Sequence, residues 1–220
     1  VFDYAETHFL AELPLTYILT CTTNTGDKTN IHGLYIGRER REFEKAVAQS
    51  QEMNLIHMDE PFQKVVVYLD PREFKSTWLG NKAVYRTRMA IADGGELIVL
   101  APGVDKFGED LENDRLIRKY GYCGREKVLE LVDRPECGDL RDNLSVAAHL
   151  IHGSSDGRFH ITYCTEQLTG DEVRGVCFGY MPYAEAAKKY DPAVLTDGYH
   201  EIDGERIFYI SNPALGLWSL

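Results

Sequence analysis

The sequence lacks the patterns by which several large protein classes are recognised. It has no Cys-x-x-Cys pair, and its 5 cysteines are an odd number, which argues against a disulfide framework or a zinc ribbon. Neither GxGxxG nor GxxxxGK[ST] occurs, so neither of these nucleotide-phosphate sites is expected. The chain also contains no internal repeat and no low-complexity segment.

Positive charge is scarce as well. The chain has 24 Lys and Arg against 35 Asp and Glu, a formal net charge of −11. Nucleic acids and anionic membranes require a basic surface, so we expect neither as a partner. No apolar run approaches the roughly 20 residues that span a bilayer, and the acidic start from Val1 to Glu6 does not look like a signal peptide. We therefore expect a cytoplasmic protein.

Strand-like and helix-like segments alternate along the chain. The clearest strand is Lys64–Asp70, a β-branched run typical of strands buried on both faces of a parallel sheet. Another strand is expected at 159–165, and helices are expected at 38–53, 109–120, 125–132 and 144–152. This alternation predicts an α/β fold of three layers, a mostly parallel sheet flanked by helices, as a single domain over 1–220.

The segment after Lys64–Asp70 is the expected place for chemistry, because ligands of open α/β sheets bind outside the carboxyl ends of the strands. The loop from Pro71 to Gly80 is long for a connection between a strand and a helix. It contains Arg72, Glu73, Lys75 and Trp78. Long loops in compact domains are commonly functional, which supports this location.

An amphipathic helix is expected to follow the loop, from 81 to 92, with Gly94-Gly95 as its C-cap and then the apolar strand that begins at 96. Tyr85, Met89 and Ala92 fall at positions i, i+4 and i+7 of that helix, the spacing of a buried stripe. By this reading Met89 is a core residue.

The 7 histidines include one pair with the spacing of metal ligands, His149 and His152. No third ligand lies close to them in the sequence. We therefore read them as a surface pair or as a pair satisfied by hydrogen bonds, and we expect no metal on this chain.

The order of these elements resembles the C-terminal domain of the nickel-pincer-nucleotide lactate racemase family. The likeness includes a strand pair at 15–24 and 31–37 and a late helix at 181–187, and it covers most of the chain. It implies a divergent racemase or epimerase of a 2-hydroxy acid. It also implies that the nickel-pincer nucleotide is held mainly by an N-terminal domain of the same protein, with none on this chain alone.

In that family a Tyr, the Gln after it and a Lys four residues after the Tyr lie on the helix that follows the central strand. Tyr85 matches the Tyr, which implies a contact with the cofactor, whereas Arg86 stands at the Gln and Met89 at the Lys. The planar fork of Arg86 suits a carboxylate, and Arg88 supplies a second cation close by. We expect Arg86 and Arg88 to bind a small anionic hydroxy acid other than lactate; no catalytic residue is assigned to this chain.

Two functions from different classes remain open. The first is the substrate-side domain of a nickel-dependent 2-hydroxy-acid racemase or epimerase. The second is a non-catalytic α/β module that binds an acidic metabolite through Arg86 and Arg88. An upstream domain with a Lys and several His favours the enzyme, and a native start near Val1 favours the module. If neither Arg86 nor Arg88 contacts a ligand, both are solvated surface charges.

Overall fold

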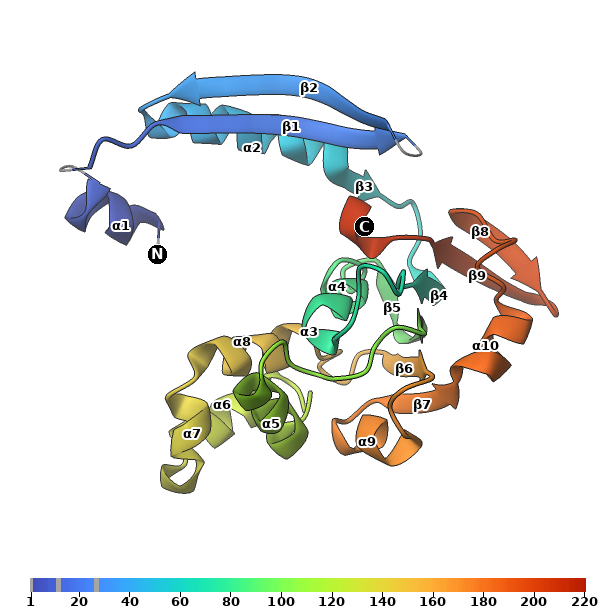
Figure 1. Ribbon diagram of the computed structural model, residues 1–220. Helices are drawn as coiled ribbons and strands as arrows, with labels where there is room; N and C mark the ends of the chain where they lie inside the picture. Colours follow the sequence, from blue (N-terminus) through green and yellow to red (C-terminus); the bar gives the residue numbers. More distant parts are fainter. Residues whose placement is uncertain (1, 11–12, 26–27) are drawn as a thin grey trace. The chain divides into compact units, whose positions relative to one another are not determined.

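The computed structural model describes residues 2–10, 13–25 and 28–220 (Figure 1). Contacts between residues divide the chain into two compact units, Val1–Ile56 and His57–Leu220. The expectation of a single domain over 1–220 stays a prediction, because grouping by contacts does not test whether the two units fold separately.

The first unit is a helix packed on a two-stranded sheet. It contains α1 (Phe2–His8), β1 (Tyr17–Thr25), β2 (Lys28–Gly37) and α2 (Arg40–Asn54), and β3 (Leu55–His57) follows. β1 and β2 pair antiparallel, with Ile18 opposite Ile36. Alternate side chains of β1 face α2, where the Cys21 thiol donates to the carbonyl oxygen of Ala46 at 3.1 Å. The strand pair and helix predicted from the sequence are therefore present, each within a few residues of its expected bounds.

The second unit is a six-stranded sheet with helices on both faces. Its strands are β4 (Phe62–Tyr68), β5 (Ile91–Ala101), β6 (His160–Thr165), β7 (Gly179–Pro182), β8 (Gly198–Ile202) and β9 (Glu205–Ile210), followed by β10 (Leu217–Ser219). Its helices are α3 (Thr77–Gly80), α4 (Lys82–Tyr85), α5 (Leu111–Tyr120), α6 (Arg125–Asp133), α7 (Gly138–Arg141), α8 (Leu144–His152), α9 (Gly170–Gly175) and α10 (Tyr183–Lys189), with short 3₁₀ turns at Pro135–Cys137 and Pro213–Leu215.

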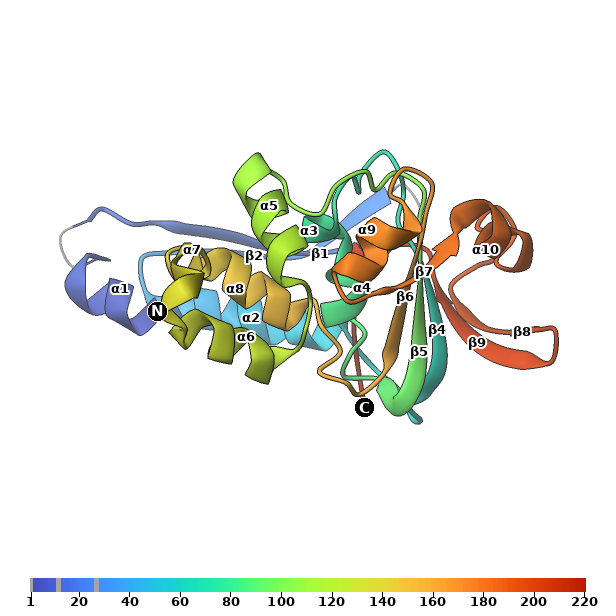
Figure 2. The same ribbon diagram turned by 90° about the horizontal axis from the view of Figure 1, so that it is seen from below.

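The strand order is β7-β6-β5-β4-β9-β8, and every neighbouring pair is parallel except β8 and β9. One face of the sheet packs against α5, α6, α8 and α9, and the other packs against α10 (Figure 2). This arrangement confirms the predicted three-layer α/β fold with a mostly parallel sheet. Within the described ranges, no helix is long and apolar enough to cross a membrane.

β4 lies inside the sheet, paired with β5 on one side and β9 on the other. Val65, Val66 and Val67 are each 0% exposed. Because side chains alternate along a strand, Val65 and Val67 join the core under α5 and α8, while Val66 joins the core under α10. The β-branched run was therefore correctly read as a buried central strand.

The helix predicted from 81 to 92 is wrong. Only Lys82–Tyr85 forms α4, and the chain turns before β5 begins at Ile91. Two contacts mark the end of the helix: the Thr87 hydroxyl donates to the Ala83 carbonyl at 2.6 Å, and Trp218 N–H donates to the Arg86 carbonyl at 2.9 Å. The second bond takes an oxygen that a continuing helix would use internally.

Two further details of this segment also differ from the expectation. Gly94-Gly95 is not a helix C-cap but part of β5, where the pairing register with β4 shifts between Phe62 and Lys64. Gly94 has φ +78°, a conformation that glycine adopts without steric cost. Met89 is 59% exposed, so it does not belong to a buried stripe.

Replacing Val66 by Asp is expected to destabilise the second unit by more than about 4 kcal/mol, since the new carboxylate is buried without a partner. Soluble yield and urea unfolding measure this effect. Val194 is 73% exposed, so Val194→Asp is the matched control and should behave like the parent chain. Equal solubility and equal stability of the two variants would contradict the buried position of β4.

Candidate functional site

The candidate site begins at the carboxyl end of β4, where the chain leaves the sheet and enters α3. Ser76 is the N-cap of α3, and its hydroxyl oxygen accepts the Leu79 N–H at 3.3 Å. Trp78 N–H donates to the Phe107 carbonyl at 2.9 Å. α3 is therefore fixed between the loop after β4 and the loop after β5, at the edge of the sheet where ligands of α/β folds bind.

An aromatic pair lines this region. The rings of Trp78 and His149 stack with centroids 4.2 Å apart and an angle of 27° between their planes. Both side chains are half-buried. The pair brings together α3 and α8, two elements that lie far apart in the sequence.

A chain of hydrogen bonds leads inward from His149. His149 Nε2 lies 3.0 Å from the Tyr122 hydroxyl, which lies 2.8 Å from the Thr77 hydroxyl, which donates to the Phe107 carbonyl at 3.0 Å. Because the Thr77 proton goes to Phe107, Thr77 accepts from Tyr122, and Tyr122 in turn accepts from His149 Nε2–H. This proton count makes Nδ1 the unprotonated nitrogen of the neutral ring.

Burial lowers the pKa of His149 to about 4, and the neighbouring His152 adds a smaller effect in the same direction. Burial likewise raises the pKa of Tyr122 well above its ordinary value. At neutral pH both groups are uncharged, so the pair offers a flat surface and a hydrogen-bond acceptor rather than a cation. The reading of His149 as a residue satisfied by hydrogen bonds agrees with this geometry, and His152 is exposed.

Asn81 lies directly beneath this chain of hydrogen bonds. It is 0% exposed, and its carbonyl oxygen accepts from the Tyr163 hydroxyl at 2.6 Å. Its Nδ2 has no hydrogen-bond partner among the described residues. Gly153 packs so closely that a Cβ there would stand 2.3 Å from Nδ2. The polar interior under Trp78 is thus tightly packed, which fixes the position of α3.

The residues predicted to bind ligands lie farther along the same segment. Tyr85 is the last residue of α4, rather than in the first turns of a helix, and burial raises the pKa of its phenol. Arg86 is half-buried, and its Nε is buried without a partner in the described structure. Arg88 is already paired, with its guanidinium 2.9 Å from Asp156. Among the described residues, Arg86 therefore has a buried donor without a partner, whereas one nitrogen of Arg88 is held by Asp156.

Sequence patterns alone do not predict the cluster of Trp78, His149 and Tyr122. Trp78 falls in the long loop after β4, whereas His149 is distinguished in the sequence only by its spacing from His152. Tyr122 lies in a short segment between two glycines and carried no signal of its own. The three side chains meet only because α5, α8 and α3 pack on the same face of the sheet.

The described residues contain no group of three or more His, Cys, Asp or Glu that could hold a metal ion. Zinc sites in proteins use at least three such ligands. Within the described residues, no side-chain cluster can therefore hold a metal ion by protein ligands alone.

A surface cavity of about 710 Å³ lies next to the start of α6, lined by charged residues that include Arg125 and Lys127. The N-terminus of α6 beside this cavity already has an anionic partner, because the Asp156 carboxylate accepts the Arg125 N–H at 2.7 Å. This cavity is therefore a weaker candidate than the segment around Trp78 and Arg86.

No protein-family model matches the chain, and no curated protein is similar enough to count as a match. Solved structures do match it. A protein from Thermotoga maritima has a TM-score of 0.72 and 21% identity, over 99% of this chain and 52% of that one. The lactate racemase apoprotein from Thermoanaerobacterium thermosaccharolyticum has a TM-score of 0.59 and 14% identity, over 86% of this chain and 43% of that one.

These comparisons show that the chain has a lactate-racemase-like fold. Identities of 21% and 14% are too low to show more than the fold. The chain spans about half the length of the structures it matches, 52% of one and 43% of the other. The activity, substrate and partners of the matched proteins are therefore not shown for this chain.

The buried His149 is expected to make stability depend on pH. Its pKa is about 4 in the folded chain and about 6.5 when unfolded, so the unfolded state binds more protons between these values. Above about pH 6.5, His149 does not change the free energy of unfolding. Below that pH the free energy of unfolding falls by up to about 1.4 kcal/mol per pH unit. Urea unfolding from pH 7 to 4 measures this slope.

The comparison requires two variants. His149→Asn should flatten the slope over this pH window, whereas His152→Asn, at an exposed position, should leave it unchanged. An identical slope in the parent and in His149→Asn would show that His149 is accessible to protons in the folded chain.

Proposed function

We propose that this chain is part of a lactate-racemase-like isomerase that acts on a small 2-hydroxy acid other than lactate. The observation that carries the proposal is the likeness in fold to the lactate racemase apoprotein, with a TM-score of 0.59 over 86% of this chain. The chain contributes the substrate-side domain, and an N-terminal domain of the same protein supplies the nickel-pincer nucleotide.

Arg86 is the residue of this domain assigned to the substrate carboxylate. Its Nε is a buried donor without a partner in the described structure, and such donors are uncommon unless a ligand or water satisfies them. A guanidinium can hold a carboxylate through two parallel hydrogen bonds. Arg88 is assigned a supporting role, because its ion pair with Asp156 already fixes its position. Tyr85 next to Arg86 is the residue assigned to the cofactor.

The test is the activity of the complete gene product made together with the enzymes that build the cofactor. Conversion of one enantiomer or epimer of a 2-hydroxy acid, with stoichiometric nickel in the protein, is the expected result. Tight binding of a hydroxy acid without conversion would instead establish the non-catalytic α/β module that binds an acidic metabolite. Absence of both binding and conversion across a panel of hydroxy acids would contradict the proposal.

In the complete enzyme, Arg86→Ala is expected to raise KM for the best hydroxy acid by about tenfold or more, because a charge-assisted contact worth roughly 1.5 to 3 kcal/mol is lost. Arg88→Ala is the matched control and should change KM about twofold at most, since its partner is Asp156. Steady-state kinetics of both variants measures the difference. The reverse order would transfer the anion-binding role to Arg88, and unchanged KM in both would remove both arginines from the site.

A further inference from the structure

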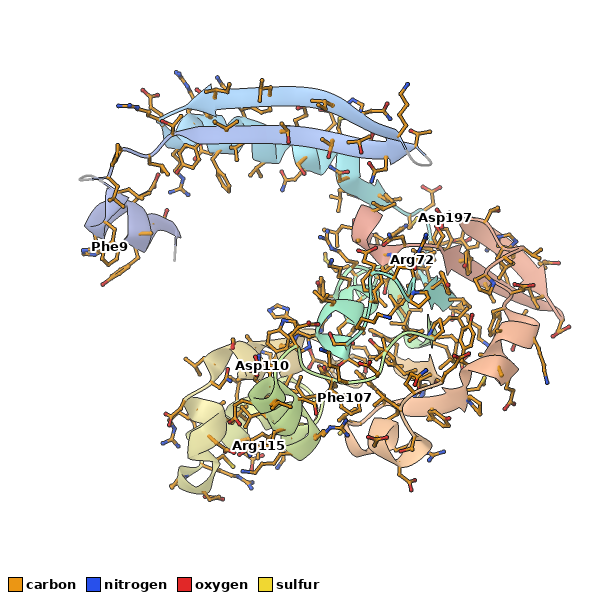
Figure 3. The ribbon with its side chains drawn as sticks, viewed as in Figure 1. Phe9, Arg72, Phe107, Asp110, Arg115 and Asp197 are labelled. Atoms are coloured by element: carbon orange, nitrogen blue, oxygen red, sulfur yellow. The ribbon has the colours of Figure 1, made fainter. Side chains whose placement is uncertain are left out.

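The sheet of the first unit has a helix on one side only. α2 packs against β1 and β2, and Cys21 on that side of the strand pair is 4% exposed. Figure 3 shows side chains on the opposite side of the pair, where no described element of the first unit lies over them. The six-stranded sheet of the second unit differs, because helices cover both of its faces. The first unit therefore has two layers where the second unit has three.

The uncovered side of the strand pair, which we call the outer face, is rich in aliphatic side chains. Side chains alternate along a strand, so Ile18, Thr20 and Thr22 point away from the side that carries Cys21. Their partners on β2 are Ile36, Leu34 and Ile31 in that order. The aliphatic members of this set are well exposed: Ile18 70%, Ile31 70%, Leu34 59% and Ile36 58%.

The outer face also lacks charge. None of its six positions holds Lys, Arg, Asp or Glu, although 59 of the 220 residues, 24 basic and 35 acidic, are of these types. When one face of an antiparallel sheet is in water, its side chains are usually polar. An exposed group of aliphatic side chains without charge is typical of an interaction surface, and it requires an apolar partner.

The edges of the strand pair are open as well. β1 and β2 contain 9 and 10 residues, and among the described residues each strand pairs only with the other. Native proteins usually cover or interrupt long strand edges, because unpaired edges associate with other chains. Two strands and one helix are also few for an independently stable sheet. The open edges and the open face together indicate that this strand pair belongs to a larger domain.

Two observations favour a further domain of the same polypeptide as the partner. The Thermotoga maritima structure matches 99% of this chain, the first unit included, but the match covers only 52% of that protein. Nearly half of that protein therefore lies outside the matched fold. A second copy of this chain is disfavoured by its charge, since each copy has a formal net charge of −11 and like charges of this size oppose self-association.

We propose that the outer face of β1 and β2 is the docking surface for the N-terminal domain of the complete protein. Apolar side chains of that domain cover Ile18, Ile31, Leu34 and Ile36, and they complete the third layer that the first unit lacks. This docking rests on the proposed function for the presence of that domain in the polypeptide. It involves neither the cofactor nor Arg86.

Cysteine labelling tests the proposal. Ile18→Cys and Ile36→Cys are made in the 220-residue chain and in the complete gene product, and peptide mass spectrometry follows the reaction of each new thiol with a maleimide. Both thiols should react rapidly in the 220-residue chain and at least about tenfold more slowly in the complete protein, where the N-terminal domain covers them. Val194→Cys is the matched control, because Val194 is 73% exposed in the second unit and should react equally in both proteins.

Equal rates for the two new thiols in both proteins would overturn the proposal. Slow labelling in the 220-residue chain would overturn it as well, and light scattering would then assign the outer face to a second copy if the chain is a dimer or to the second unit if it is a monomer. A complete gene product without a domain before Val1 would also overturn it.

Labelling does not depend on catalysis, so the docking and the proposed function can fail separately. Slow labelling in a complete protein that neither binds nor converts a hydroxy acid would support the docking and contradict the proposed function. Conversion of a hydroxy acid by a protein whose outer face labels rapidly would overturn the docking alone.

A charge on the outer face gives a second readout. Ile36→Asp should leave the thermal unfolding midpoint of the 220-residue chain unchanged, because the position is 58% exposed. The same substitution should lower the midpoint of the complete protein, since the carboxylate would be buried against the N-terminal domain. Val194→Asp should leave both midpoints unchanged. Equal effects of Ile36→Asp on the two proteins would overturn the proposal.

Discussion

The second unit depends on the burial of one strand between two parallel neighbours. The side chains of β4 alternate between two separate cores, with Val65 and Val67 on one face and Val66 on the other. Each fully buried valine contributes roughly 1.5 to 3 kcal/mol of hydrophobic stabilisation. β4 therefore holds the two helical layers together, and its carboxyl end leads into the segment that contains Trp78 and Arg86. Trp78 follows it on one face, and Tyr209 lies beside it on the other.

The features that the sequence predicted correctly are the ones determined by neighbouring residues. The run Lys64–Asp70 was read as a central strand because β-branched side chains without alternation suit burial on both faces. The helix expected at 109–120 appears as α5, where Asp110 accepts the Asn113 N–H at 2.8 Å. In both cases the signal that predicts the element lies within a few consecutive residues.

The features that failed depend on distant residues. Periodicity between 81 and 92 favours a helix, but Trp218 from the end of the chain binds the Arg86 carbonyl and the helix ends at Tyr85. The same holds for the candidate site. Arg88 is held by Asp156, a residue of a turn that sequence patterns do not place near Arg88, whereas the Arg86 Nε has no partner among the described residues. The fold class was predictable from the alternation of segments, whereas the partners of individual polar side chains were not.

The position of β9 has a consequence for the synthesis of the protein on the ribosome. β9 pairs directly with β4, although β5, β6 and β7 all precede it in the chain. Until β9 leaves the ribosome, β4 has an unpaired edge of buried-type side chains, including Val65 and Val67, on the growing chain. Unpaired apolar strand edges are templates for association with other chains. The growing chain thus passes through a stage in which this edge is open to association with other chains, and the pairing of β9 ends that stage.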